Sequence, residues 1–168
     1  MKKTLPLLTS AIIGLASTHC IADSSGPYIG AKTGTMQVNL SAYDDVSANG
    51  LAIGYNINKW LGLEFELVNS SSGDYDFYYS QGEYEISTRA FYTTFRTPGA
   101  FYFKGKGGII QEELEISRGY DDDDDNDEIG GSVAVALGYN AGPVSFEVSY
   151  TLVEEDVTYT AAGLYVHF

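Results

Sequence analysis

Residues 61–68 read L-G-L-E-F-E-L-V, with apolar and polar or small side chains at alternate positions. In an extended strand, successive side chains point to opposite faces. The apolar set therefore shares one face: Leu61, Leu63, Phe65 and Leu67. The opposite face carries Gly62, Glu64 and Glu66. The stretch predicts a β-strand with one bulky apolar face and one face of small or charged residues.

The same alternation recurs along the chain after residue 22, without a convincing amphipathic helix. It predicts eight strands, at 28–40, 51–56, 61–68, 84–96, 100–116, 130–139, 144–153 and 157–168. Long polar loops at 41–50, 69–83 and 117–129 alternate with short turns at 57–60, 97–99 and 140–143, and only 154–156 departs from this order. This spacing favours an all-β fold, an eight-stranded antiparallel up-and-down transmembrane β-barrel with its long loops outside the cell.

A soluble sandwich or lipocalin-type barrel explains the alternation equally well, but it places the bulky face inside and the charges in water. Charge distribution separates the two interpretations. The long loops and 154–156 hold 15 of the 23 acids against one base, Arg118, whereas the short turns hold Lys59 and no acid. A soluble barrel exposed equally at both ends gives no reason for this segregation, so the sequence favours the membrane barrel.

Composition excludes several other classes. The formal charge of −14 argues against nucleic-acid binding by phosphate neutralisation. One cysteine, Cys20, excludes a disulfide framework and a cysteine-based zinc site. Beyond residue 22 the sequence has one histidine, His167, near the end expected to face the periplasm, and no nucleophile motif. We therefore expect neither an enzyme nor a cofactor.

Residues 1–22 are predicted to be a signal peptide, followed by an outer-membrane β-barrel domain at 23–168. Lys2 and Lys3 precede a short apolar stretch, and Cys20-Ile21-Ala22 ends with a pattern that signal peptidase reads. A transmembrane helix needs about 20 apolar residues, more than this stretch offers. A lipoprotein would use Cys20 as its lipidated residue, but His19 stands where a small residue is expected.

Three runs carry a family resemblance: Y-I-G-A-K-T-G at 28–34, G-Y-N-I-N-K-W-L-G-L-E-F-E at 54–66 and the terminal G-L-Y-V-H-F at 163–168. Together they resemble the eight-stranded outer-membrane barrels related to the OmpA transmembrane domain and the opacity-type porin family. The resemblance implies the outer membrane of a Gram-negative bacterium. It also implies that Leu164, Val166 and Phe168 form the signal read by the barrel-assembly machinery.

Projecting the alternation inward predicts a barrel-interior charge network of four bases and four acids. Its members are Lys32, Arg89, Lys104 and Lys106 with Glu64, Glu66, Glu85 and Glu147. Arg89 is turned inward because a lipid-facing arginine near the midplane costs about 2 to 4 kcal/mol. The resemblance implies a network role for Lys32 and Glu64. The network is either a structural plug or a gate for small ions.

The predicted loops suggest recognition. Asp121, Asp123 and Asp125 are candidates for a divalent cation site, the alternative being a solvated, self-repelling loop. Tyr75, Phe77, Tyr78 and Tyr79 interleave with Asp74 and Asp76, as a recognition surface or as interfacial anchors. We expect a non-enzymatic outer-membrane protein that stabilises the envelope and presents acidic, Tyr-rich loops for adhesion; the alternative is a narrow or gated porin-like channel. Expected partners are outer-membrane lipids, lipopolysaccharide, the assembly machinery and an extracellular ligand or host surface.

Overall fold

The computed structural model describes residues 25–38, 45–77, 80–117, 126–153 and 157–168. It contains nine strands: β1 (Gly26–Val38), β2 (Val46–Asn56), β3 (Leu61–Ser70), β4 (Gly73–Phe77), β5 (Ser80–Arg96), β6 (Phe101–Ser117), β7 (Asn126–Ala141), β8 (Val144–Leu152) and β9 (Val157–His167). Within these ranges no helix is long and apolar enough to cross a membrane. The predicted signal peptide, with Cys20, lies outside the described residues.

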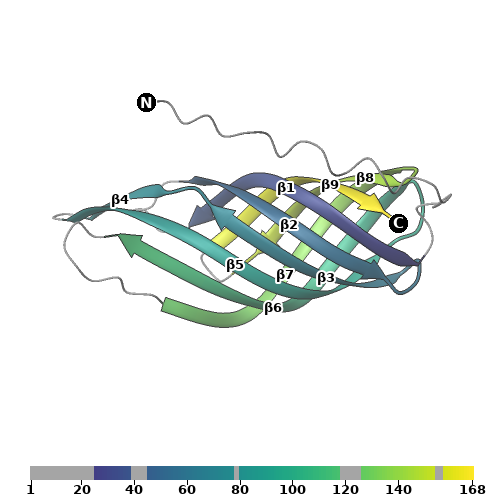
Figure 1. Cartoon of the computed structure of the whole chain (residues 1–168), viewed down its shortest axis with the longest axis horizontal. Coiled ribbons are helices and arrows are strands. Elements are labelled where there is room, and N and C mark those ends of the chain that lie inside the picture. Colours follow the sequence, from purple (N-terminus) through teal and green to yellow (C-terminus); the bar gives the residue numbers. More distant parts are fainter. Residues whose placement is uncertain (1–24, 39–44, 78–79, 118–125, 154–156) are drawn as a thin grey trace, which may run out of the picture.

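Eight of the strands close into a barrel. All neighbouring strands are antiparallel, in the order β3-β2-β1-β9-β8-β7-β6-β5, and a further pairing of β3 with β5 closes the cylinder. The short strand β4 pairs with β5 and extends the β4–β5 hairpin beyond the barrel wall, as Figure 1 shows. The predicted eight-stranded antiparallel barrel is confirmed.

Several strands run further into the predicted long loops than the sequence indicates. β2 begins at Val46, β5 at Ser80 and β7 at Asn126, while β6 continues to Ser117. The sequence prediction ended each strand where apolar alternation ended. Backbone pairing continues past that point, because ladder hydrogen bonds do not depend on apolar side chains. The barrel wall therefore rises above its apolar band.

The bulky apolar side chains face outward, and small, polar and charged side chains face inward. In β2, Leu51, Ile53 and Tyr55 are exposed, whereas Ala52 is fully buried. Exposed aromatic side chains gather near the end with the short turns: Tyr55, Trp60, Phe95, Phe101, Tyr139 and Phe168. This outside-apolar arrangement suits a wall in contact with lipid, with an aromatic belt at one interface. The soluble alternative, with its bulky face inside, is wrong.

Candidate functional site

Six charged side chains from four strands meet in the middle of the barrel interior. They are Lys32 of β1, Glu64 and Glu66 of β3, Lys104 and Lys106 of β6, and Glu147 of β8. Their inward direction follows from the two-residue period of a strand, which places both members of each same-strand pair on one face. Each exposes at most 5% of its surface. Three ammonium groups thus meet three carboxylates in a site shielded from water.

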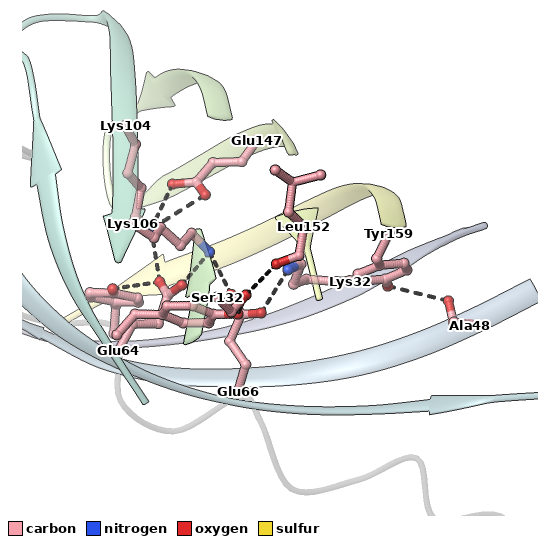
Figure 2. A network of polar contacts seen from close by, with 12 residues as sticks. Lys32, Ala48, Glu64, Glu66, Lys104, Lys106, Ser132, Glu147, Leu152 and Tyr159 are labelled. Carbon is pink, nitrogen blue, oxygen red and sulfur yellow. Dashed lines mark hydrogen bonds and ion pairs between the residues drawn. The ribbon is translucent and has the colours of Figure 1, made fainter. Parts of the chain in front are cut away.

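The six side chains form one continuous line of alternating charge, shown in Figure 2. At one end the Lys32 Nζ atom lies 2.9 Å from Glu66 Oε2. Lys106 then bridges Glu66 and Glu64. At the other end Lys104 Nζ lies 2.8 Å from Glu64 Oε2 and 3.1 Å from Glu147 Oε1. Each inner member touches two partners of opposite charge, which is what buried ions need to offset their lost hydration.

Tyrosine side chains lie along this line and donate further hydrogen bonds to its carboxylates. The Tyr28 hydroxyl donates to Glu64 Oε2 at 2.6 Å, and the Tyr102 hydroxyl donates to Glu147 Oε1 at 2.6 Å. The Lys104 ammonium lies 5.3 Å from the centroid of the Tyr28 ring and 5.2 Å from that of Tyr165. Cation–π contacts of this kind supplement the ion pairs where water is excluded.

Three of these rings lie over glycines on the neighbouring strand. Tyr28 pairs with Gly54, Tyr165 with Gly30 and Tyr102 with Gly138. A Cβ atom added to these glycines would lie 2.1 to 2.2 Å from a ring atom. The glycines therefore make room for the tyrosines, whose role in the site sequence reasoning missed. The available signal was the cross-strand pairing of glycine with tyrosine, which requires the register.

Arg89 and Glu85 were expected inside, and that expectation is wrong. Both side chains face outward: Arg89 approaches Glu113 at 3.3 Å, and Glu85 accepts a hydrogen bond from the Ser72 hydroxyl at 2.7 Å. Arg89 shares the outer face with Phe91 and lies opposite Leu67, at the border where the exterior turns polar. An arginine costs only about 0 to 1 kcal/mol there, so the argument that turned it inward fails.

Two further inward charged residues, one toward each end of the barrel, were not predicted. Arg96 is buried at the short-turn end, and its guanidinium carbon lies 5.4 Å from the centroid of the Tyr102 ring. Glu112 of β6 is buried toward the loop end. For Arg96 the signal was present, because placing Phe91 and Phe95 outward turns the even-numbered residues of β5 inward.

The short-turn end also brings a serine and a histidine together. His167 Nε2 lies 2.8 Å from the hydroxyl oxygen of Ser145, which is completely buried, and the His167 ring packs 5.3 Å from the Tyr28 ring. Near it the chain end is tied to β1, since the Phe168 N–H donates to the Pro27 carbonyl at 3.0 Å. This geometry orders the terminal strand.

Of the predicted assembly signal, the side chains of Leu164 and Phe168 are exposed, and Val166 is partly exposed. Leu164 and Val166 belong to the outward set of β9, and Phe168 directly follows that strand. Recognition of these residues by an assembly machinery stays a prediction.

The residues of the candidate cation site, Asp121, Asp123 and Asp125, lie outside the described residues, as do Tyr78 and Tyr79. In the part of the chain that the structure describes, no group of three or more His, Cys, Asp or Glu side chains is placed to hold a metal ion.

Comparison with known proteins places this geometry in a family context. A family model described as "Outer membrane protein beta-barrel domain" matches residues 7–167. No curated protein matches the chain at a significant level.

Solved structures share the fold at low sequence identity. Neisserial surface protein A is 16% identical with a TM-score of 0.65, covering 86% of this chain and 98% of its own. Ail of Yersinia pestis, in complex with the heparin analogue sucrose octasulfate, is 14% identical with a TM-score of 0.61, covering 86% and 97%. The N-terminal barrel domain of Pseudomonas aeruginosa OprF is 11% identical with a TM-score of 0.58, covering 86% and 100%.

Proposed function

The chain belongs to the outer membrane protein beta-barrel family, and from this premise we propose that it is a non-enzymatic surface protein whose filled barrel anchors an acidic recognition surface. The observation that carries the proposal is the unbroken line of six buried charges across the barrel interior. An eight-stranded barrel has an interior just wide enough for side chains to fill. The barrel is then a closed, filled cylinder that stabilises the envelope, and binding to partners takes place at its outer end.

The outer end supplies the recognition surface. The β4–β5 hairpin projects beyond the barrel wall, as seen in Figure 1, and pairs Asp74 with Glu83 and Asp76 with Gln81 along its backbone ladder. The sequence interleaves these acids with Tyr75 and Phe77. A hairpin that is both acidic and aromatic suits a partner with basic and apolar groups.

The negative charge of this chain argues against the kind of ligand seen with one of its structural neighbours. Ail was solved with sucrose octasulfate, a highly sulfated sugar. The present chain carries a formal charge of −14, with most of its acids in the predicted long loops and in 154–156. Like charges repel, so we propose a cationic partner on the host or bacterial surface and expect no affinity for sulfated sugars.

Cell-surface binding tests this proposal. Bacteria displaying the wild-type chain are compared with a variant in which residues 73–80 are replaced by a two-residue turn, and with Asp74→Asn/Asp76→Asn. The deletion is expected to abolish binding to surfaces coated with a basic protein. The Asp74→Asn/Asp76→Asn variant is expected to bind more weakly than the wild type, and the difference between the two should grow as the salt concentration is lowered, because salt screens exposed charges. Full binding by the deletion variant would refute the role of the hairpin. Heat-modifiable migration serves as the control for barrel closure.

A gated channel for small ions is the competing function, because the same ionised groups lie across the interior of the cylinder. Planar-bilayer recording separates the two. A plugged barrel gives no steady conductance, and Lys32→Met leaves it silent. Steady openings whose conductance changes when Lys32 or Glu64 is neutralised would replace the plug with a gate.

A further inference from the structure

A groove of about 680 Å³ crosses the outer wall of the barrel, over β8, β9, β1, β2 and β3. Its larger side chains form one row in register: Phe146 opposite Leu164, Leu164 opposite Ala31, Ala31 opposite Leu51, and Leu51 opposite Leu67. All of these side chains point outward. The groove therefore lies in the wall that faces lipid.

Small residues hollow out the middle of this row. Ala31 is the one small residue of the row, and Ala162, the next outward residue of β9 toward the loops, lines the groove beside it together with Gly163. Elsewhere the outward positions of the band are mostly filled by Leu, Ile, Val, Phe or Tyr. A depression in a lipid-facing wall is filled by whatever the membrane supplies, because leaving it empty forfeits dispersion contacts on one side.

The groove runs obliquely across the membrane. Phe146 lies near the short-turn start of β8, whereas Leu67 lies near the loop end of β3. Five strands at about 4.8 Å spacing make the row about 19 Å long. With strands tilted about 40° from the barrel axis, the row rises about 12 Å. That rise approaches one leaflet, half of a hydrocarbon core about 30 Å thick.

The end of the groove nearer the loops is polar. Asn49 and Asn69 face each other across β2 and β3 and line the groove there. The next position in the row, opposite Leu67, is Arg89. Arg89 is half-exposed, and among the described residues it is the one basic side chain exposed on the barrel wall. The Arg89 guanidinium also lies 3.3 Å from Glu113, an exposed pair weak enough for a lipid phosphate to compete with it. An apolar trough that ends in two amides and this guanidinium matches a lipid with a phosphate beside its acyl chains.

We propose that this groove binds one phosphorylated lipid of the outer leaflet, with an acyl chain along Ala31 and Ala162 and the phosphate at Arg89. The polar end fixes the leaflet, because it points toward the loop end. The proposal stands apart from the recognition surface and extends beyond the function proposed above. A second copy of the chain is the competing occupant.

Native mass spectrometry tests the proposal directly. The barrel is reconstituted in phosphatidylcholine nanodiscs that contain bisphosphorylated lipid A, then released and weighed with its retained lipid. Ala31→Leu/Ala162→Leu fills the groove, and Thr93→Leu, an outward substitution on β5, is its matched control. Arg89→Gln removes the phosphate partner, and Lys59→Gln, an exposed base in a turn, is the control for charge.

The wild type is expected to retain one lipid A. The filled variant binds it about tenfold more weakly or worse, and Arg89→Gln about two- to fivefold more weakly, the size of an exposed ion pair. Both controls bind as the wild type does. The proposal is overturned if the folded Ala31→Leu/Ala162→Leu variant still retains lipid A. It is also overturned if the wild type is a dimer and the same double substitution converts it to a monomer, because the groove is then a contact between two copies of the chain. If the double variant does not fold, Ala31→Val and Arg89→Gln decide the question in the same assay.

Discussion

Replacing Glu64 by glutamine tests the physical basis of the interior site most directly. The Glu64 carboxylate forms ion pairs with Lys104, at 2.8 Å, and with Lys106. It also accepts a hydrogen bond of 2.6 Å from the Tyr28 hydroxyl. Glutamine keeps the shape but removes the charge, so three lysines remain against two carboxylates. Breaking a buried pair by removing one partner costs about 3 to 5 kcal/mol, because the other charge stays buried. We expect Glu64→Gln to lower the free energy of unfolding by that amount.

Glu147→Gln provides a graded comparison. Glu147 has one lysine contact, to Lys104, which keeps its second contact to Glu64. We therefore expect Glu147→Gln to lower the free energy of unfolding by about 2 kcal/mol, which is typical for the loss of hydrogen bonds to one charged group. The order of the two variants follows from the position of each carboxylate in the line.

Urea unfolding in phosphatidylcholine vesicles measures both values. The single tryptophan, Trp60, is exposed near the short turns and reports on the lipid interface. Heat-modifiable migration gives an independent measure of closure. Combining Glu64→Gln with Lys106→Met completes a double-mutant cycle, in which the combined loss is smaller than the sum by more than about 1 kcal/mol. The reasoning is refuted if Glu64→Gln unfolds at the same urea concentration as the wild type and its free energy of unfolding depends on urea with the same slope.

Three further predictions concern other parts of the chain. Gly54→Ala places a methyl group against the ring of Tyr28, whose hydroxyl is held by its hydrogen bond to Glu64. We expect this variant to lower the free energy of unfolding by about 1 to 3 kcal/mol. Gly131→Ala has open space around the new methyl group and is expected to change that free energy by less than about 1 kcal/mol in the same urea titration. Arg89→Gln alters that energy by no more than about 1 kcal/mol, because its ion pair is exposed. Mass spectrometry of protein from outer-membrane fractions should give a mature chain that starts after Ala22; an intact Met1 contradicts the predicted cleavage.

The direction of most side chains was predictable because strand alternation is a local property. The period of two in 61–68 and 144–152 is enough to place Glu64, Glu66 and Glu147 on the inner face once the bulky face is assigned to lipid. Charge segregation between loops and turns supplied that assignment. For these strands no information about neighbours was needed.

The errors arise where position along the barrel axis matters. Arg89 was turned inward by a cost that applies at the midplane, yet its height follows from its pairing with Leu67 and Gln111, which no single strand reveals. The interior tyrosines were missed for the same reason, since Tyr28 and Gly54 become partners only through the register. Contacts between strands are non-local, so composition and period cannot rank them.

The interior charges also explain how one register is selected. A slip of β3 by one residue would turn Glu64 and Glu66 toward lipid and bring Phe65 into the polar interior. Buried ion pairs add little net stability over apolar packing, but an unpaired charge against hydrocarbon is heavily penalised. Because the outer wall contacts lipid and not water, the hydrophobic effect does not drive apolar side chains into the barrel interior. The apolar pattern therefore specifies only the outer face. The line of alternating charge specifies the inner one, and with it which strands must meet across the cylinder.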